Sequence, residues 1–217
     1  MLKMSSKEIS NIREDYIKSK IDFTSLPESP LTFFENWFNM ALLNDKENAI
    51  SFVLSTITKG NKPSSRVVLL RGIDKQGFTF YTNYNSDKAK DIDNNNYVSA
   101  NFFWHNLEKQ VRIIGIAKMV SPEQSDQYFK GRPRGSQIGS WVSNQSSVVN
   151  INEDFSLRTE EIEKQFKGLE VSRPENWGGY CIMPEKIEFW QGRPSRLHDR
   201  LVYIKKGDIW VKKRLSP

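Results

Sequence analysis

A histidine near the C-terminus lies between two arginines, with one residue separating it from each: Arg196, His198 and Arg200. On an extended segment these three side chains point the same way, because alternate side chains share a face. Cationic neighbours lower the affinity of a histidine for its own proton. A lone histidine is usually structural, but this arrangement favours an anion site, and Trp190 offers a flat apolar surface for an aromatic ring.

Two more arginines, Arg66 and Arg71, bound an apolar run. On a strand, residues five apart point to opposite faces, so we expect these two to diverge. A guanidinium at the end of a half-buried strand pairs well with an anion, and phosphate suits its fork. The alternative is that both side chains extend along the strand ends into water.

Residues 81–88 read as the end of a strand followed by the start of a helix. Backbone N–H groups at a helix N-terminus bind phosphate, and Lys88 in the first turn adds positive charge. A plain helix capped by Ser86 explains the same residues equally well.

Residues 128–146 combine two arginines, a tyrosine, several hydroxyl groups and three glycines within 19 positions. Guanidinium, hydroxyl and exposed backbone amide groups are what an anion pocket uses. A surface loop would account for the glycines but not for Ile138 and Trp141 among the polar residues.

The elements that must position these residues are mostly short strands joined by turns. We expect strands at residues 49–58, 66–73, 77–82, 97–105, 110–120, 179–183, 186–191, 200–205 and 208–213. We expect helices at residues 6–20, from Pro30 onward, from Ser86 to Asn94, from Ser121 to near Gly131, and at residues 153–167. Strands and helices do not alternate, which favours a mainly β, α+β fold: an antiparallel barrel with peripheral helices. Neither common glycine-rich nucleotide loop is present.

Composition narrows the class further. The 217 residues are 37% hydrophobic, which is enough for a core, and no run approaches the ~18–20 apolar residues of a membrane-spanning helix. Lys and Arg outnumber Asp and Glu by 32 to 26, which favours anionic partners, but the bases are dispersed rather than clustered as in a nucleic-acid binder. With a polar N-terminus and Cys181 as the only cysteine, a cytoplasmic protein without an intrachain disulfide is expected.

Taken together and in order, these segments resemble the pyridoxine/pyridoxamine 5′-phosphate oxidase family over nearly the whole chain. No single stretch is decisive, but their joint occurrence is specific. The matching stretches are residues 66–70, 80–83, 104–105, 108–111, 136–143, 145–147, 177–179, 187–192, 196–200 and 214–217.

The resemblance implies an FMN-binding split β-barrel and a homodimer with the site at the subunit interface. It implies an FMN-dependent oxidase that converts pyridoxine 5′-phosphate and pyridoxamine 5′-phosphate to pyridoxal 5′-phosphate. Dioxygen would be the acceptor, giving hydrogen peroxide, and the amine would also give ammonia. It further implies a flexible segment at residues 1–25 and a single domain at residues 26–217, with no metal, nucleic acid or membrane partner.

The resemblance also assigns roles to individual residues. Those expected to bind FMN are Arg66, Val67, Val68, Leu69, Leu70, Arg71, Tyr81, Thr82, Lys88, Gln110, Gln145, Ser146, Trp190 and Arg200. Those expected to bind the substrate are Arg71, Tyr128, Arg132, Ser136, Arg196 and His198, with Arg13 and Tyr16 in a segment that closes over the site. Arg196 and His198 are the expected catalytic residues.

Two positions depart from the family pattern. Arg71 stands where the family usually has lysine, which replaces a point charge by a planar fork. Asp87 stands where the family often has arginine. Beside the FMN phosphate this carboxylate would repel the phosphate, unless it faces solvent or stabilises the helix start.

Three other functions compete with the oxidase. The first is another split-barrel flavoprotein, such as a flavin reductase-like or nitroreductase-like enzyme. The others are a non-catalytic binder of FMN or pyridoxal phosphate and a basic nucleic-acid binder.

Overall fold

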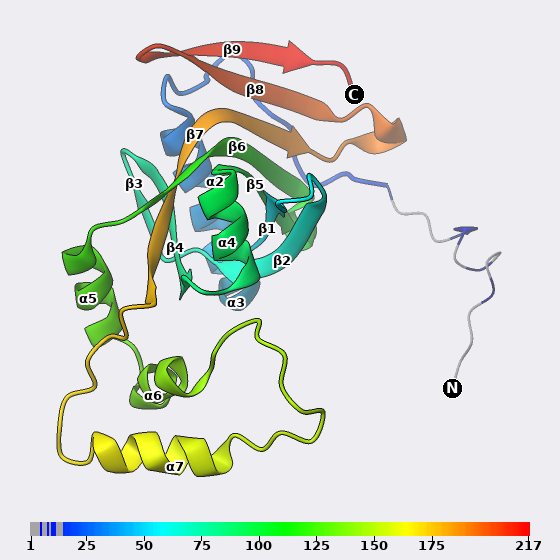
Figure 1. Ribbon diagram of the computed structural model, residues 1–217. Helices are drawn as coiled ribbons and strands as arrows, with labels where there is room; N and C mark the ends of the chain where they lie inside the picture. The colour runs from blue at the N-terminus through cyan, green and yellow to red at the C-terminus, as the bar shows by residue number, and fades with distance from the viewer. Residues whose placement is uncertain (1–4, 6–7, 9, 12–14) are drawn as a thin grey trace. The chain divides into compact units, whose positions relative to one another are not determined.

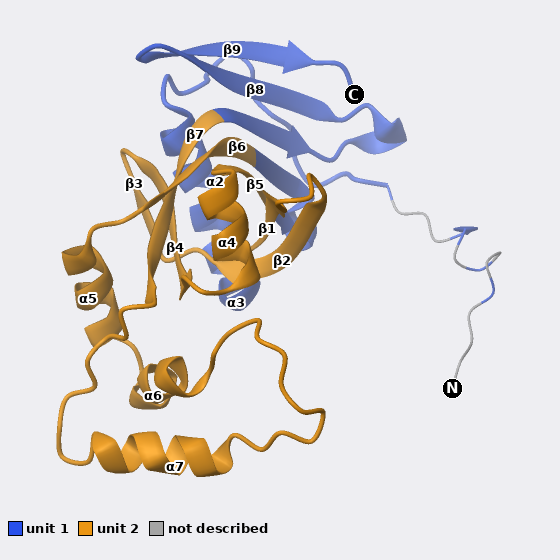
Figure 2. Ribbon diagram, viewed as in Figure 1, with its two compact units in different colours: residues 1–49, 102–112, 186–217 blue, residues 50–101, 113–185 orange. Residues whose placement is uncertain are grey.

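A computed structural model describes residues 5, 8, 10–11 and 15–217 of the chain. Arg13, one of the predicted substrate-binding residues, therefore lies outside the described residues. The chain divides into two compact units, which Figure 2 shows in different colours. Unit 1 comprises residues 1–49, 102–112 and 186–217, and unit 2 comprises residues 50–101 and 113–185.

Unit 2 is built on an antiparallel sheet. Its strands are β1 (Ser51–Ile57), β2 (Pro63–Leu69), β3 (Gly72–Asp74), β4 (Gly77–Asn83) and parts of β5 (Tyr97–Trp104), β6 (Lys109–Met119) and β7 (Trp177–Gln191). They are hydrogen-bonded in the order β2-β1-β5-β6-β7-β4-β3. β1 pairs antiparallel with both β2 and β5, and β4 pairs antiparallel with both β3 and β7. The predicted antiparallel hairpins are thus confirmed.

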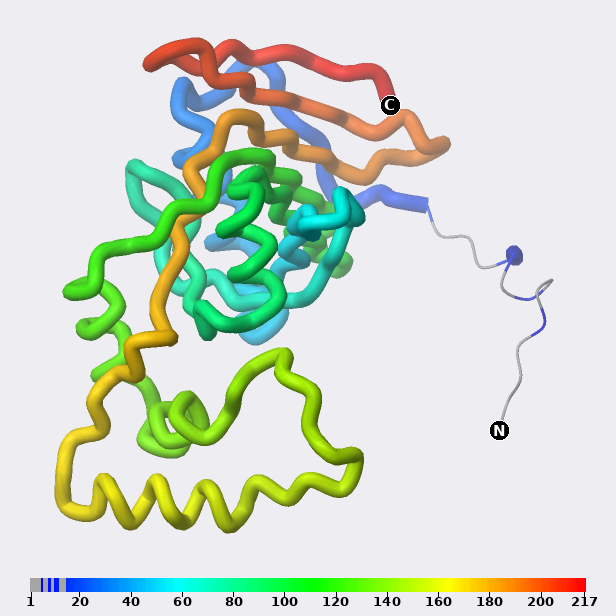
Figure 3. Tube along the Cα trace, in the orientation of Figure 1, coloured from blue at the N-terminus to red at the C-terminus, as the bar shows by residue number. Residues whose placement is uncertain are grey.

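The helices of unit 2 are α4 (Asp87–Asn94), α5 (Pro122–Lys130), α6 (Arg134–Val142) and α7 (Ser156–Gln165). α4 packs against β1, and α6 packs against α7 (Figure 1). The Ser121 side chain caps α5 by accepting the backbone N–H of Gln124 at 3.2 Å. A long connection without helix or strand joins α6 to α7, as the tube in Figure 3 shows.

Unit 1 contains the helices α2 (Pro30–Asn44) and α3 (Lys46–Ala49), the short 3-10 helices η1 (His105–Leu107) and η2 (Pro194–Arg196), and the strands β8 (Asp199–Lys206) and β9 (Ile209–Leu215). The end of β7 pairs antiparallel with β8, and β8 pairs with β9. Ser29 caps α2 ahead of Pro30. As the predicted apolar face requires, α2 buries Phe34, Trp37 and Ala41.

Three predicted elements differ from the structure. The strand predicted at 66–73 ends at Leu69: the backbone N–H of Leu70 bonds to Ile50, whereas that of Arg71 bonds to Thr79 on β4, so the chain changes partners there. The strands predicted at 179–183 and 186–191 are one strand, β7, which continues through Pro184. Residues 15–20, at the end of the helix predicted for 6–20, are not helical. Within the described chain, no helix is long and apolar enough to span a bilayer.

Candidate functional site

Unit 2 contains a cavity of about 1230 Å³. Most of the residues that the sequence marked for anion and ring binding in this unit line it. The predicted residues that line it are Arg66, Val67, Val68, Leu69, Arg71, Tyr81, Thr82, Lys88, Tyr128, Arg132, Ser136 and Gln145. Leu70 and Ser146 do not line it; Ser146 instead accepts the backbone N–H of Asp87 at 3.2 Å.

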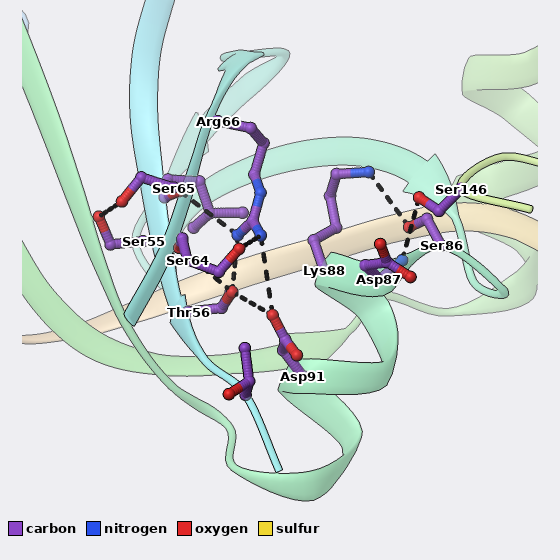
Figure 4. A network of polar contacts seen from close by, with 12 residues as sticks. Ser55, Thr56, Ser64, Ser65, Arg66, Ser86, Asp87, Lys88, Asp91 and Ser146 are labelled. Carbon is purple, nitrogen blue, oxygen red and sulfur yellow. Dashed lines mark hydrogen bonds and ion pairs between the residues drawn. The ribbon is translucent and has the colours of Figure 1, made fainter. Parts of the chain in front are cut away.

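Arg66 is fixed by a network of polar contacts on the inner side of β1 and β2 (Figure 4). Its guanidinium donates to the Thr56 hydroxyl at 2.6 Å and to the Ser64 hydroxyl at 2.7 Å. The carboxylate of Asp91 lies 3.7 Å from the same guanidinium. Burial lowers the pKa of Arg66, and Asp91 and then Asp87 oppose that shift. The guanidinium is therefore held in one orientation beside the cavity.

Lys88 lies in the first turn of α4 and is almost fully buried. Its ammonium group donates to Gln145 at 3.0 Å, to Ser86 at 3.1 Å and to Thr82 at 3.2 Å. Burial lowers the pKa of Lys88, and the positive charge of Arg66 lowers it further. Two cations that disfavour each other across one cavity wall form a site for an anion.

Ser86 precedes α4 as predicted, but its side chain does not cap the helix. The hydroxyl instead donates to the backbone oxygen of Asn83 at 2.7 Å and accepts from Lys88. Asp87 is exposed in the first turn of α4, so it faces solvent, but its charge still acts on Arg66 and Lys88 and opposes the lowering of their pKa values.

Arg66 and Arg71 line the same cavity, so the prediction that they point to opposite sides is wrong. The alternation rule fails because β2 ends between them. The positive charge of Arg71 also contributes to lowering the pKa of Arg132, after burial, so these two arginines are neighbours. The cavity thus holds a second cationic pair, Arg71 and Arg132.

Arg132 is positioned by an aromatic ring and a hydroxyl. Its guanidinium lies 4.4 Å from the ring centre of Trp177 and donates to Ser140 at 2.6 Å. Sequence reasoning assigned no role to either partner. Both residues belong to stretches that carried the resemblance, 177–179 and 136–143, but nothing in the sequence indicates that either side chain contacts Arg132. The contact with Ser140 depends on residues 134–142, described above as a possible loop, forming α6.

Three flat rings stack beside Arg132. Tyr81 and Tyr128 are parallel, with centroids 3.8 Å apart, and Trp177 stacks on Tyr81 at 5.6 Å. Burial raises the pKa of Tyr81, so its hydroxyl stays protonated at neutral pH. The stack gives this end of the cavity an apolar wall beside a cation.

A second group of predicted residues lies in unit 1. The Trp190 and His198 rings have centroids 4.6 Å apart, and Tyr16 meets Trp190 edge-on at 5.5 Å and His198 at 5.8 Å. The Nδ1 atom of His198 accepts the backbone N–H of Arg193 at 3.1 Å. Burial, and then the charge of Arg196, lower the pKa of His198, which favours the neutral imidazole.

The extended geometry predicted for residues 196–200 is wrong at its start. Ser195 and Arg196 have left-handed backbones, with φ of 56° and 61°, and Arg196 ends the 3-10 helix η2. Arg196 is exposed. Arg200 lies near the start of β8, and its guanidinium pairs with the buried carboxylate of Glu188 at 2.7 Å. Gln110, on β6, is half-buried.

Chemically, the cavity offers two separate cationic pairs, several hydroxyl donors and a flat aromatic wall. This set suits a ligand, or two ligands, carrying phosphate groups and a planar ring. Among the described residues, no group of three or more His, Cys, Asp and Glu side chains could hold a metal ion.

Comparisons with known proteins agree with this description. The family model for pyridoxamine 5′-phosphate oxidase matches residues 41–166, and the model for the pyridoxine 5′-phosphate oxidase C-terminal dimerisation region matches residues 177–217. The pyridoxine/pyridoxamine 5′-phosphate oxidase of Leptospira biflexa is 43% identical over 210 residues, covering 97% of this chain and 99% of the relative. That of Cytophaga hutchinsonii is 46% identical over 211 residues, covering 96% and 98%.

Two solved structures are also similar. PhzG from Burkholderia lata, in complex with tetrahydrophenazine-1-carboxylic acid, has a TM-score of 0.85 at 27% identity and covers 92% of this chain and 100% of its own. A pyridoxamine 5′-phosphate oxidase-related, FMN binding protein from Nostoc punctiforme has a TM-score of 0.71 at 15% identity, covering 88% and 100%, and so shows the fold alone. The chain belongs to the pyridoxine/pyridoxamine 5′-phosphate oxidase family and has its α+β split-barrel fold.

Proposed function

We propose that this chain is an FMN-dependent oxidase that converts pyridoxine 5′-phosphate and pyridoxamine 5′-phosphate to pyridoxal 5′-phosphate, with dioxygen as acceptor. Relatives of that name are 43% and 46% identical over nearly the whole chain. The observation that carries the proposal is the presence of two cationic pairs, Arg66 with Lys88 and Arg71 with Arg132, on the wall of one cavity. A cofactor and a substrate that each end in phosphate need two such anchors.

The residues of the cavity fit FMN. The cavity's volume of about 1230 Å³ exceeds the roughly 300–1,000 Å³ of an ordinary ligand pocket, so the cavity suits two ligands rather than one. Arg66 and Lys88 would hold the FMN phosphate, and Thr82 and Gln145 would orient the ammonium group of Lys88. When bound, FMN would supply the two-electron acceptor that no side chain of the protein provides.

The second cationic pair would hold the substrate phosphate. Arg132 is oriented by Ser140 and by the face of Trp177, and Tyr128 and Ser136 line the cavity beside it. A fixed guanidinium supplies binding energy far from the reacting carbon, and this energy offsets the entropy lost when the substrate ring is oriented. Arg71 adds a planar fork to this anchor in place of the usual lysine.

Trp190, Arg196 and His198 would hold the pyridine ring. Because Nδ1 of His198 accepts the Arg193 N–H, a neutral imidazole carries its hydrogen on Nε2. In that tautomer His198 donates a hydrogen bond through Nε2 and is not poised to accept a proton there. Arg196 would stabilise negative charge on the substrate. If His198→Asn kept the pH profile of kcat, histidine would have no role as a base.

We propose a homodimer with the site at the subunit interface. The match of residues 177–217 to a dimerisation region supports a dimer. Sedimentation should give twice the mass of one chain, and a monomer at micromolar concentration would contradict the proposal. The flexible segment at 1–25, the single domain at 26–217 and a cytoplasmic location stay predictions.

One experiment separates the proposed function from its rivals. The purified protein should show a flavin spectrum and, with pyridoxamine 5′-phosphate in air, form aldehyde and peroxide in equal amounts. Bound flavin without peroxide would indicate a non-catalytic binder or another flavoprotein. Absence of flavin together with strongly salt-dependent binding of DNA or RNA would indicate a nucleic-acid binder.

A further inference from the structure

Two buried carboxylates hold the chain that leads into α2. Glu108, in the turn between β5 and β6, accepts the backbone N–H of Lys18 at 2.9 Å. Asp199, at the start of β8, accepts the backbone N–H of Ile21 at 3.2 Å. Both acidic residues are only 6% exposed. A buried carboxylate that accepts a backbone N–H forms a strong, charge-assisted hydrogen bond.

Each carboxylate is fixed before it meets this chain. Asp199 is paired with Arg193 at 3.0 Å and with Arg214 at 3.3 Å. Glu108 has a left-handed backbone with φ of 54°, and its backbone oxygen accepts the N–H of Gly192 at 2.8 Å. The two acceptors are therefore part of a rigid frame, whereas residues 15–21, which contain the two residues that they hold, form neither helix nor strand.

The consequence of this fastening is the position of Tyr16, two residues before Lys18. Its ring lies directly over Gly192, where a Cβ atom would come within 2.5 Å of the tyrosine Cγ. The same ring meets Trp190 at an angle of 88° and His198 at 65°. Tyr16 can fill this place only if the chain that follows it is held close to the frame.

We infer that Glu108 and Asp199 are positioning residues that act through Tyr16: by fastening Lys18 and Ile21 they keep its ring against Trp190 and His198. The consequence for catalysis rests on the proposed function, because it takes Trp190 and His198 to hold the substrate ring. The fastening itself does not, and it is measured without turnover.

Two matched pairs of variants test the two ends of the Lys18 hydrogen bond. Glu108→Asn shortens the side chain while keeping a residue that tolerates the left-handed backbone, and Glu108→Gln keeps an oxygen at the original reach. Lys18→Pro removes the N–H, and Lys18→Ala keeps it while removing the contact of the Lys18 ammonium group with Asn106. If Glu108→Asn fails to fold, the Lys18 pair still tests the bond.

The first readout is the rate at which trypsin cuts after Lys20 in the full-length protein. Glu108→Asn and Lys18→Pro should be cut about tenfold faster than wild type, the size expected for losing one hydrogen bond to a charged group. Lys18→Ala should stay within about twofold of wild type, and Glu108→Gln, which keeps an acceptor oxygen but loses its charge, should be cut at a rate between those of wild type and Glu108→Asn. Equal cleavage of Lys18→Pro and Lys18→Ala would overturn the inference, whatever the protein's activity.

The second readout is steady-state kinetics with pyridoxine 5′-phosphate. Glu108→Asn and Asp199→Asn should raise KM more than they lower kcat, because the chemistry is untouched. In a Tyr16→Ala background, Glu108→Asn should add little further effect, since residues that act through one another are not additive. Fully additive effects on KM would overturn the role assigned to Tyr16. A protein without activity that still shows the trypsin pattern would refute the proposed function and leave the fastening intact.

Discussion

The hydroxyl of Thr56 donates its hydrogen to Asp91 at 2.6 Å, and both residues are buried. A hydroxyl has one hydrogen, so Thr56 acts as the acceptor towards Arg66, and this fixes the direction of the chain of contacts from Arg66 through Thr56 to Asp91 in Figure 4. Thr56 therefore passes the orientation of a buried carboxylate on to the arginine that lines the cavity.

Thr56→Val should break this relay while keeping the shape of the side chain. The carboxylate of Asp91 loses a buried donor, so the free energy of unfolding should fall by about 1–3 kcal/mol, and FMN should bind more weakly because Arg66 is less well oriented. Urea denaturation and flavin fluorescence titration measure the two effects. Ser55→Ala is the matched control, since the Ser55 hydroxyl meets only that of Ser65 on the other face of β1. Equal flavin affinity in both variants would contradict the relay.

Arg132→Lys should raise KM for the substrate by roughly tenfold and leave FMN affinity unchanged. Lysine keeps the charge but loses the fork that bonds Ser140 and lies flat on Trp177. Arg134→Lys is the comparison: Arg134 donates to the backbone oxygens of Phe166 and Leu169 and does not line the cavity. It should lower Tm without moving KM. A KM that responds equally to both changes would argue against an anchor specific to Arg132.

Asp87→Asn should tighten FMN binding. The carboxylate acts electrostatically on both Arg66 and Lys88, so it competes with a phosphate for the same two cations. A two- to fivefold gain is expected at low ionic strength, shrinking as salt screens the exposed charge, because the screening length is about 10 Å at 0.1 M. Asp93→Asn, an exposed site on the same helix, is the control. If the affinity for FMN changed with neither the substitution nor the salt concentration, Asp87 would have no electrostatic effect on the bound phosphate.

Lys109 should make the free energy of unfolding depend on pH in the alkaline range. It is buried, lies 4.3 Å from the ring centre of Trp37 and donates to Gln191. Burial lowers its pKa to about 8, whereas an unfolded lysine titrates near 10.4. Between these values the unfolded chain binds more protons, so the free energy of unfolding rises with pH.

The comparison that isolates this effect is wild type against Lys109→Met, by urea denaturation at pH 7, 8, 9 and 10. Wild type should gain stability relative to the variant as the pH rises through that range, because the buried lysine sheds the charge that burial penalises. A stability difference that stays constant from pH 7 to 10 would show that Lys109 keeps its ordinary pKa.

Helices that depend on apolar spacing and N-terminal capping could be predicted from the sequence, because both signals lie within the helix or next to it. The helix from Pro30 follows from its apolar spacing, and the helix from Ser121 follows from Ser-Pro capping; both form as predicted. Helix α6 escaped detection because Gly135, Gly139 and two serines give it a loop-like composition, and its stability comes from burying Ile138 and Val142 in a tertiary cluster.

The site shows the same division between local and non-local information. Residue types and the family resemblance identified Arg66, Lys88 and Arg132, which all line the cavity. Their partners Asp91 and Ser140 lie 25 and eight positions away in the sequence and reach them only after folding. Changes of backbone direction also could not be predicted from the sequence. β2 ends at Leu69, and Ser195 and Arg196 have left-handed backbones, so the side chains nearby do not alternate between two faces as they would on a continuous strand.

The single thiol of the chain has a practical consequence. Cys181 is buried on β7, and its pKa is raised by burial, so it reacts slowly with alkylating reagents. A cysteine introduced at exposed Lys20 would then be the one site that a maleimide dye labels readily. The unmodified chain is thus already a suitable background for attaching a fluorophore and watching the segment around Tyr16 in real time.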